Sequence, residues 1–209
     1  MNDDIGLPPG ALEKQDPRDD ATFYVQPRLV THIDDRAIAS LTNCYRELLP
    51  SGGVLLDLMS SWVSHLPEDV AYGEIIGHGM NAEELAANPR LTRWFIQDLN
   101  QNPTLELSDA SVDAAMICVS IQYLQKPVAV LKEVARVLRP GAPIVISFSN
   151  RCFPTKAVAI WLGLDDSQRA QLVAYYLQNA GFKNIAGRQL IEDYEFGVSD
   201  PLTAIVARS

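Results

Sequence analysis

The stretch from Ser111 to Asn150 constrains the fold of this chain most, because it predicts strand, loop, helix, turn and strand in succession. Val112 to Val119 is an almost wholly apolar run, as expected for a strand buried on both faces of a parallel sheet. Pro127 suits the first turn of a helix, which Pro140-Gly141 ends. Ile144 to Phe148 then resumes an apolar strand. Two parallel strands joined by a helix require a right-handed crossover, so the sequence predicts an α/β sheet.

The same stretch resembles the segment between the fourth and fifth strands of class I S-adenosylmethionine-dependent methyltransferases, in particular a small-molecule group related to quinone-biosynthesis enzymes. The resemblance is carried by Val112-Asp113-Ala114-Ala115, by Gln122-Tyr123-Leu124 and by the run EVARVLRPG from Glu133 to Gly141. It extends over roughly residues 51–209. It implies a Rossmann-like α/β fold with a seven-stranded, mostly parallel sheet in the order 3-2-1-4-5-7-6, helices on both faces and a C-terminal antiparallel hairpin. Such a match indicates fold more than chemistry.

Composition limits the kinds of partner. The 209 residues and 47% hydrophobic content suit one domain with a full core. A net charge of −9 argues against binding to nucleic acid or an anionic membrane, and favours small molecules or proteins as partners. Cys44, Cys118 and Cys152 lack disulfide or zinc-ligand spacing, so we expect reduced thiols, no metal site and a cytoplasmic location. No apolar run reaches the length of a membrane span.

The N-terminal part divides into two segments. Residues 1–20 are rich in aspartate and proline, which predicts a mobile acidic tail before a single domain from 21 to 209. Residues 21–50 are expected to cap the domain with a helix that begins near Asp34 or Asp35. In the family such a segment often lies over the cofactor site, so substrate contacts are predicted at Tyr24, Arg28 and His32, with His32 a candidate general base. Simple packing of Tyr24 and His32 against the sheet edge is the alternative.

Val54 to Leu58 predicts the first strand of the core, and its acid, Asp57, stands near the carboxyl end where open α/β sheets bind ligands. The resemblance places Leu56 to Trp62 on the glycine-rich first cofactor motif of the family. Met59 and Ser61 stand where this motif has glycines, so the Met59 side chain either lines the cofactor pocket or fills it. The serines are expected to stand at the start of a helix, which would offer backbone N–H groups. The predicted cofactor contacts are Asp57, Leu58, Met59, Ser60 and Ser61.

The run from Gly77 to Ala82 supports two interpretations. As G-x-G-x-x-A after a strand it nominally meets the dinucleotide fingerprint, which would indicate an NAD(P)-dependent oxidoreductase. In the methyltransferase alignment this strand should end in an acid that holds both ribose hydroxyls, and Gly79 stands in that place. Met80 or Asn81 could substitute for the acid. The predicted cofactor contacts here are Gly77, Gly79, Met80 and Asn81, whereas His78 is expected to be a local hydrogen-bonding residue.

Further site residues follow the later strands. Gln97-Asp98-Leu99 matches the third motif of the family, in which the acid receives the adenine amino group, so Asp98 and Leu99 are predicted cofactor contacts. Ser120 is expected to touch the cofactor. The predicted substrate contacts beyond the fourth and fifth strands are Gln122, Tyr123, Asn150 and Arg151, and packing of Tyr123 under the crossover helix is the alternative for that residue. Arg151 and Lys156 could pair with an acidic substrate.

The predicted function is methyl transfer from S-adenosylmethionine to a small molecule. Enzymes of this family align a nucleophile with the sulfonium methyl group in a dry cleft, so much of the rate comes from proximity and orientation. For that reason the sequence identifies no catalytic residue. Two alternatives stay open: a catalytically inactive relative that serves as a binding or assembly protein, and an NAD(P)-dependent oxidoreductase that uses Gly77 to Ala82.

Overall fold

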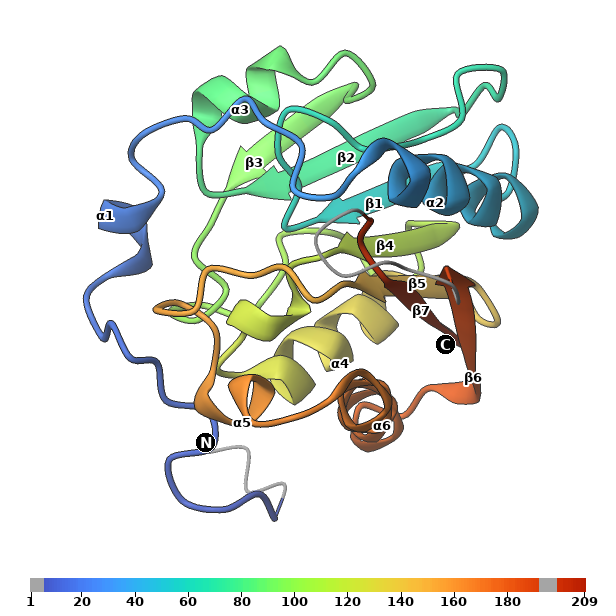
Figure 1. The fold of residues 1–209 in the computed structure, drawn as a ribbon. Coiled ribbons are helices and arrows are strands. Elements are labelled where there is room, and N and C mark those ends of the chain that lie inside the picture. Colours follow the sequence, from blue (N-terminus) through green and yellow to red (C-terminus); the bar gives the residue numbers. More distant parts are fainter. Residues whose placement is uncertain (1–5, 192–198) are drawn as a thin grey trace.

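The fold is built around one seven-stranded sheet with the strand order β3-β2-β1-β4-β5-β7-β6. The computed structural model describes residues 6–191 and 199–209 (Figure 1). The strands β1 to β5 run parallel, and β7 pairs antiparallel with both β5 and β6. This is the sheet that the resemblance implies, so the predicted fold class is confirmed. The strands are β1 Val54–Leu58, β2 Glu74–Gly79, β3 Arg93–Ile96, β4 Ala114–Cys118, β5 Pro143–Phe148, β6 Lys183–Ile191 and β7 Leu202–Arg208.

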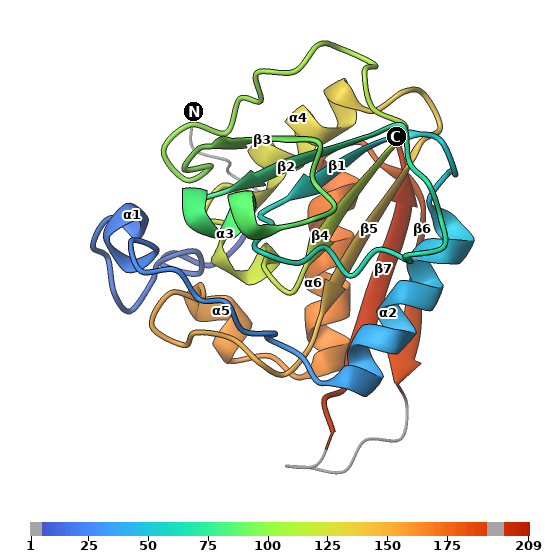
Figure 2. The ribbon, with the colours of Figure 1, turned by 90° about the horizontal axis from the view of Figure 1, so that it is seen from above.

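Helices cover both faces of the sheet. Helices α2 (Asp35–Leu48) and α3 (Ala82–Ala87) lie on one face, and α4 (Pro127–Val137) and α6 (Asp166–Asn179) lie on the other (Figures 1 and 2). The short helices α1 (Asp20–Phe23) and α5 (Ala159–Leu162) and the 3-10 turn η1 (Ile121–Tyr123) lie towards the carboxyl ends of the parallel strands. Among the described residues, no helix is both long and apolar enough to cross a bilayer.

Alternation along the central strands divides the core into two layers. Leu56 and Ile117 pack with the apolar side chains of α4 and α6. Their neighbours Leu55 and Met116 pack with the α2 side chains on the opposite face. Successive residues of a strand point to opposite faces, so a strand covered by helices on both sides has to be apolar throughout. This explains why β1 and β4 read as continuous apolar runs in the sequence.

The helix starts predicted near Asp34 and at Pro127 agree with the structure, and a further cap lies at Asp165. The Asp34 side chain accepts a hydrogen bond from the Ala37 backbone N–H at the start of α2, and Asp165 forms a reciprocal capping box with Gln168 at the start of α6. Pro127 is the first residue of α4, as its fixed φ allows. The Asp34 cap lies within three residues of the group that it satisfies, which is why the sequence alone located it.

The predicted helix after β1 is wrong. Residues 59–73 connect β1 to β2 without a helix. Met59 and His65 have positive φ values of 59° and 53°, which interrupt a right-handed helix, and Pro67 removes a backbone donor. Ser60 and Ser61 therefore lie in an irregular loop and not at a helix N-terminus.

Residues 6–20 are packed against the body of the protein, in contrast to the mobile tail predicted for 1–20. Backbone N–H groups of Ala159 and Ile160 donate to the carbonyls of Glu13 and Ala11 at 2.8 and 2.9 Å. The Lys156 ammonium is fully buried, 3.1 Å from an Asp20 carboxylate oxygen, and Lys14 also pairs with Asp20. These two lysines neutralise the Asp20 carboxylate. Residues 1–5 lie outside the described part.

Candidate functional site

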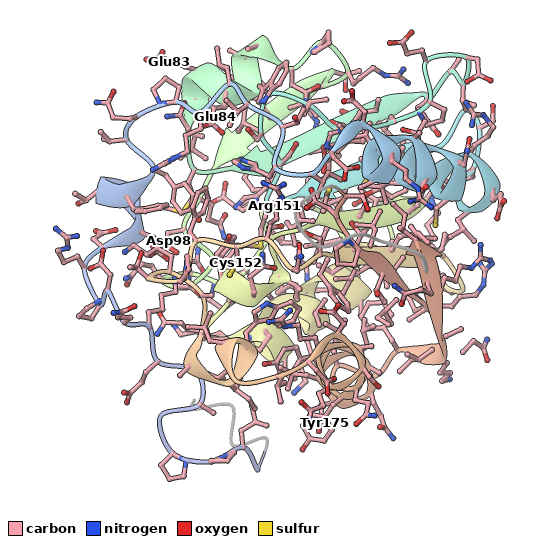
Figure 3. All side chains as sticks on the ribbon, in the orientation of Figure 1. Glu83, Glu84, Asp98, Arg151, Cys152 and Tyr175 are labelled. Carbon is pink, nitrogen blue, oxygen red and sulfur yellow. The ribbon has the colours of Figure 1, made fainter. Side chains whose placement is uncertain are left out.

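A cavity of about 340 Å³ opens at the carboxyl ends of the parallel strands, and Tyr24, Arg28 and His32 of the N-terminal segment line it. Its volume falls in the range of small-molecule sites. Predicted cofactor contacts that line it are Asp57, Met59, Ser60, Ser61, Gly79, Met80, Asn81, Asp98, Leu99 and Ser120. Predicted substrate contacts that line it are Tyr24, Arg28, His32, Tyr123 and Arg151. Figure 3 labels Glu84, Asp98, Arg151 and Cys152, which lie around this cavity.

The structure places the remaining predicted contacts elsewhere. Leu58 is fully buried in the core on the α4 side. The Gln122 side chain is 1% exposed, and its Nε2 donates to the Val119 carbonyl oxygen at 2.8 Å. Asn150 is exposed beyond the end of β5. A side chain added at Gly77 would meet Leu91 behind the strand, so this glycine faces away from the cavity.

The dinucleotide interpretation of Gly77 to Ala82 is not supported. Gly77 and Gly79 are both inside β2, where they pair with β3 residues Trp94 and Ile96. A phosphate-binding glycine loop has to form the turn between a strand and a helix, with free backbone N–H groups at the helix start. Here the helix starts only after Asn81, whose side chain already caps it.

Met59, the first residue of the loop after β1, has a backbone angle that favours glycine. This left-handed φ is one that glycine adopts without strain. The Met59 backbone N–H donates to Nδ1 of His78 at 3.1 Å, and Nε2 of His78 lies 2.9 Å from the Gln97 carbonyl oxygen. Since a carbonyl only accepts, the imidazole proton is on Nε2. Burial lowers the pKa of His78 to about 4. His78 is therefore neutral and hydrogen-bonds residues near it, and local hydrogen bonding is the role predicted for it.

Asp57 also anchors this loop, through hydrogen bonds from two of its serines. Its carboxylate accepts hydrogen bonds from the hydroxyls of Ser60 and Ser64, both at 2.6 Å, and its side chain is 3% exposed. Desolvation by burial raises the pKa of Asp57 to about 6, although both serine hydrogen bonds act in the opposite direction. The Ser60 hydroxyl is thus engaged by the protein, although Ser60 lines the cavity.

No acid can stand at the family's ribose position. An added Cβ at Gly79 would lie 2.7 Å from the Ser60 carbonyl oxygen and 3.2 Å from Leu85. The predicted substitute, Asn81, is also engaged. Its oxygen accepts from the backbone N–H groups of α3, and its nitrogen donates to the carbonyls of Tyr24 and Val25 at 2.9 and 3.2 Å. Asn81 therefore fastens the N-terminal segment over the site and has no amide atom left for a ribose.

Two polar groups face the cavity with unused hydrogen-bonding capacity. Asp98 follows β3, and its Oδ1 accepts from the Asn100 backbone N–H at 2.8 Å. Its second oxygen has no donor among residues 6–191 and 199–209. The Ser120 hydroxyl after β4 is buried and has no hydrogen-bond partner in the described part of the chain. An acceptor and a hydroxyl at these two strand ends are binding groups for a polar ligand.

Sequence reasoning missed several residues of the cavity wall. Trp62, His78, Gln97 and Leu124 lie inside the quoted motifs, and the others come from segments without one. Burial lowers the pKa of His65 and of His78 to about 4, raises that of Cys118 to about 12 and raises that of Cys152. Within the described ranges, no group of three or more histidine, cysteine, aspartate or glutamate side chains has the geometry to hold a metal ion. The missed residues are Asp20, Val30, Thr31, Trp62, Val63, His65, His78, Glu84, Gln97, Asn100, Cys118, Val119, Leu124, Cys152 and Phe153.

Known structures share this architecture. A methyltransferase from Archaeoglobus fulgidus is similar with a TM-score of 0.63 and 14% identity, over 84% of this chain and 95% of that one. A methyltransferase from Aquifex aeolicus has a TM-score of 0.58 and 16% identity, over 90% of this chain and 96% of that one. Phosphoethanolamine N-methyltransferase 2 from Haemonchus contortus, in complex with S-adenosyl-L-methionine, has a TM-score of 0.57 and 13% identity. The similarity covers 82% of this chain and 52% of that one. At such identities the similarity shows the fold alone.

The sequence comparisons are more specific about the family. Curated proteins give no sequence match. A family model described as a methyltransferase domain matches residues 61–146, which include β2, β3, β4, α4 and part of β5. The match begins at Ser61, so it leaves out β1 and Met59. With the strand order and the cavity at the carboxyl edge, this match supports the resemblance to class I S-adenosylmethionine-dependent methyltransferases.

Proposed function

We propose that the cavity binds S-adenosylmethionine and that the protein transfers its methyl group to a small molecule. The family match and the fold support this cofactor. The observation that carries the proposal is the unused carboxylate oxygen of Asp98 at the end of β3, on the wall of a cavity at the strand carboxyl ends. Open α/β sheets bind their ligands at this edge. A cytoplasmic location also remains a prediction.

The residues of the cavity fit the cofactor at two places and depart from the family at a third. Asp98 offers an acceptor for the adenine amino group, and Ser120 offers a hydroxyl beside the end of β4 for the amino-acid half. Met59 lines the cavity without filling it, since about 340 Å³ stays open, and its φ keeps the loop turn. The acidic ribose clamp is absent. When bound, the cofactor supplies an electrophilic methyl group on a positively charged sulfur.

The protein contributes positioning and exclusion of water to this reaction. The N-terminal segment is fastened over the cavity by Asn81 and by Glu84, which accepts from the Arg28 backbone N–H at 2.7 Å. A covered site of low polarity orients the acceptor atom and strengthens local electrostatic interactions. Burial lowers the pKa of His32, so its imidazole is neutral at pH 7 and able to accept a proton from the methyl acceptor.

Asp98→Asn is expected to weaken binding of S-adenosylhomocysteine about 10- to 100-fold, because a hydrogen bond to a charged acceptor contributes about 1.5–3 kcal/mol. The asparagine oxygen can keep the bond to the Asn100 N–H, so the loop should stay folded. Titration calorimetry measures the effect. Asp69→Asn is the matched control, since Asp69 is an exposed partner of Arg46. Equal affinity of Asp98→Asn and the parent protein would contradict the proposed adenine contact.

Calorimetric titration with S-adenosylmethionine, S-adenosylhomocysteine and NADH separates the candidate functions. Binding of the first two supports the proposal, and label transfer from methyl-labelled cofactor to candidate acceptors then tests the reaction. Binding of NADH alone would replace the proposal with the oxidoreductase. Absence of all binding would leave the catalytically inactive relative, which the missing ribose acid and the missing helix after β1 favour.

A further inference from the structure

Arg28 is an unpaired cation on the cavity wall. Its guanidinium forms no salt bridge within the described residues, and its hydrogen bonds go to the carbonyls of Phe23 and Gln26 at 3.0 and 3.5 Å. The other arginine of the cavity, Arg151, is paired with Asp200 at 2.6 Å. Lys156, which the sequence also suggested for an acidic substrate, is held by Asp16 and Asp20. Arg28 is thus the cavity cation with charge left to offer a ligand.

Aromatic rings fix the position of this guanidinium. Its central carbon lies 4.4 Å from the Phe23 ring centroid and 5.3 Å from that of Phe153. Phe153 in turn stacks on Tyr123 at 6.0 Å and meets His32 edge-on at 5.5 Å. Rings on the flat face of an arginine restrain it while leaving its edge N–H groups available. The guanidinium is therefore held in place in a flat, apolar surrounding before any ligand arrives.

Two phenol groups add neutral donors to the same wall. The Tyr24 hydroxyl has no hydrogen-bond partner among the described residues, and Tyr123 accepts from the Phe153 backbone N–H at 2.9 Å without a described acceptor for its own proton. Burial raises the pKa of Tyr24 and raises that of Tyr123 to about 12, so both keep their protons at neutral pH. Protonated phenols next to an arginine stabilise an anion.

The acids of the cavity do not compete for this cation. Asp20 is paired with Lys14 and Lys156, and Asp57 accepts from two serine hydroxyls. Glu84 accepts from the Ser61 hydroxyl at 2.6 Å and from the Arg28 backbone N–H. The free oxygen of Asp98 is at the end of β3, the place proposed for adenine. The wall formed by Arg28, Tyr24 and Tyr123 is therefore rich in donors that no acid among residues 6–191 and 199–209 uses.

We propose that Arg28, with Tyr24 and Tyr123, receives the carboxylate of a flat apolar acid, so that the substrate of this cavity is an aryl carboxylic acid. The assignment rests on the proposed function for the methyl-transfer reaction, but the anion site is a separate property that binding alone can test. The guanidinium offers two parallel N–H groups to the carboxylate, and the aromatic rings accommodate the flat body of the acid. The competing occupant of Arg28 is the carboxylate of the cofactor itself.

The test uses benzoate and its neutral isostere benzamide, titrated by calorimetry into the full-length protein with and without saturating S-adenosylhomocysteine. We expect benzoate to bind the loaded protein at least tenfold more tightly than benzamide. Arg28→Gln should remove that preference while keeping an amide donor for the Phe23 carbonyl. Tyr24→Phe should weaken benzoate alone by about threefold. Arg93→Gln is the matched control, since Arg93 pairs with Glu74 on the surface.

Two results would overturn the assignment. The first is equal binding of benzoate and benzamide, or an unchanged preference in Arg28→Gln with an unchanged melting temperature. The second is a tenfold loss of S-adenosylhomocysteine affinity in Arg28→Gln while 5′-methylthioadenosine, which lacks the amino-acid carboxylate, binds as before. If benzoate binds through Arg28 but S-adenosylhomocysteine does not bind at all, the proposed function fails and the anion site stands.

Discussion

Gly79→Asp is expected to lower the free energy of unfolding by about 4 kcal/mol instead of restoring the ribose clamp of the family. An added Cβ lies 2.7 Å from the Ser60 carbonyl oxygen, which is backbone and cannot rotate away. Overpacking of this kind costs about 1–3 kcal/mol, and the carboxylate is placed without a donor beside an oxygen acceptor, which costs a further few kcal/mol. For a chain of this size the melting temperature should fall by about 10 °C.

Thermal and urea unfolding measure the effect of Gly79→Asp. Gly79→Ala, which keeps only the steric part, should cost about half as much. Gly187→Asp is the matched control, because Gly187 is on the edge strand β6 and its added Cβ would meet only Ile205 at 3.6 Å. The explanation fails if Gly79→Asp is as stable as the parent and binds S-adenosylhomocysteine more tightly, since the acid would then have entered the site.

His78→Leu is expected to lower the free energy of unfolding by about 3 kcal/mol at pH 7. The substitution leaves the Met59 N–H and the Gln97 carbonyl without their buried partner, and each such group costs about 1–3 kcal/mol. The left-handed Met59 then loses the hydrogen bond that holds it. His78→Gln, which can both donate and accept, should recover part of the loss.

The effect of His78 on stability depends on pH in a defined direction. Its pKa is about 4 in the folded protein against 6.5 for the free side chain, so the unfolded chain binds the proton first. The contribution of His78 is therefore complete above pH 6.5 and is lost as the pH falls towards 4. At pH 5 the difference between parent and His78→Leu should shrink by about 2 kcal/mol, at 1.36 kcal/mol for each pH unit below 6.5.

Other groups change the pH profile of the parent protein but not this difference. His65, whose pKa burial also lowers to about 4, acts in the same direction as His78. Asp57 acts in the opposite direction, because its pKa of about 6 in the folded state exceeds its free value of 3.8 and its contribution weakens as the pH rises between them. Urea unfolding of both proteins at pH 7 and pH 5 isolates His78. If the difference in free energy of unfolding between the two proteins is the same at both pH values, the His78 imidazole is not held in its neutral form by the fold.

The sequence was sufficient for the fold because its signals are local. The apolar runs of β1, β4 and β5 are periodic patterns, and the caps Asp34 and Asp165 act within three residues of themselves. The resemblance around residues 111–150 then supplied the strand order. Local signals failed at residues 59–73, where the positive φ values of Met59 and His65 exclude the expected helix. No residue pattern in that segment predicts these positive φ angles.

The sequence by itself determined the layers of this protein, and the tertiary structure alone decided the state of its site. Three features depend on segments far apart in the chain: Asn81 is engaged by Tyr24, Gly79 faces Ser60, and Arg28 has no acid partner in the part of the chain that the structure describes. Asn81 and Tyr24 are separated by 57 positions. Secondary structure follows from interactions within a few residues. Whether a polar atom has a hydrogen-bond partner, in contrast, is known only when all its neighbours in space are known.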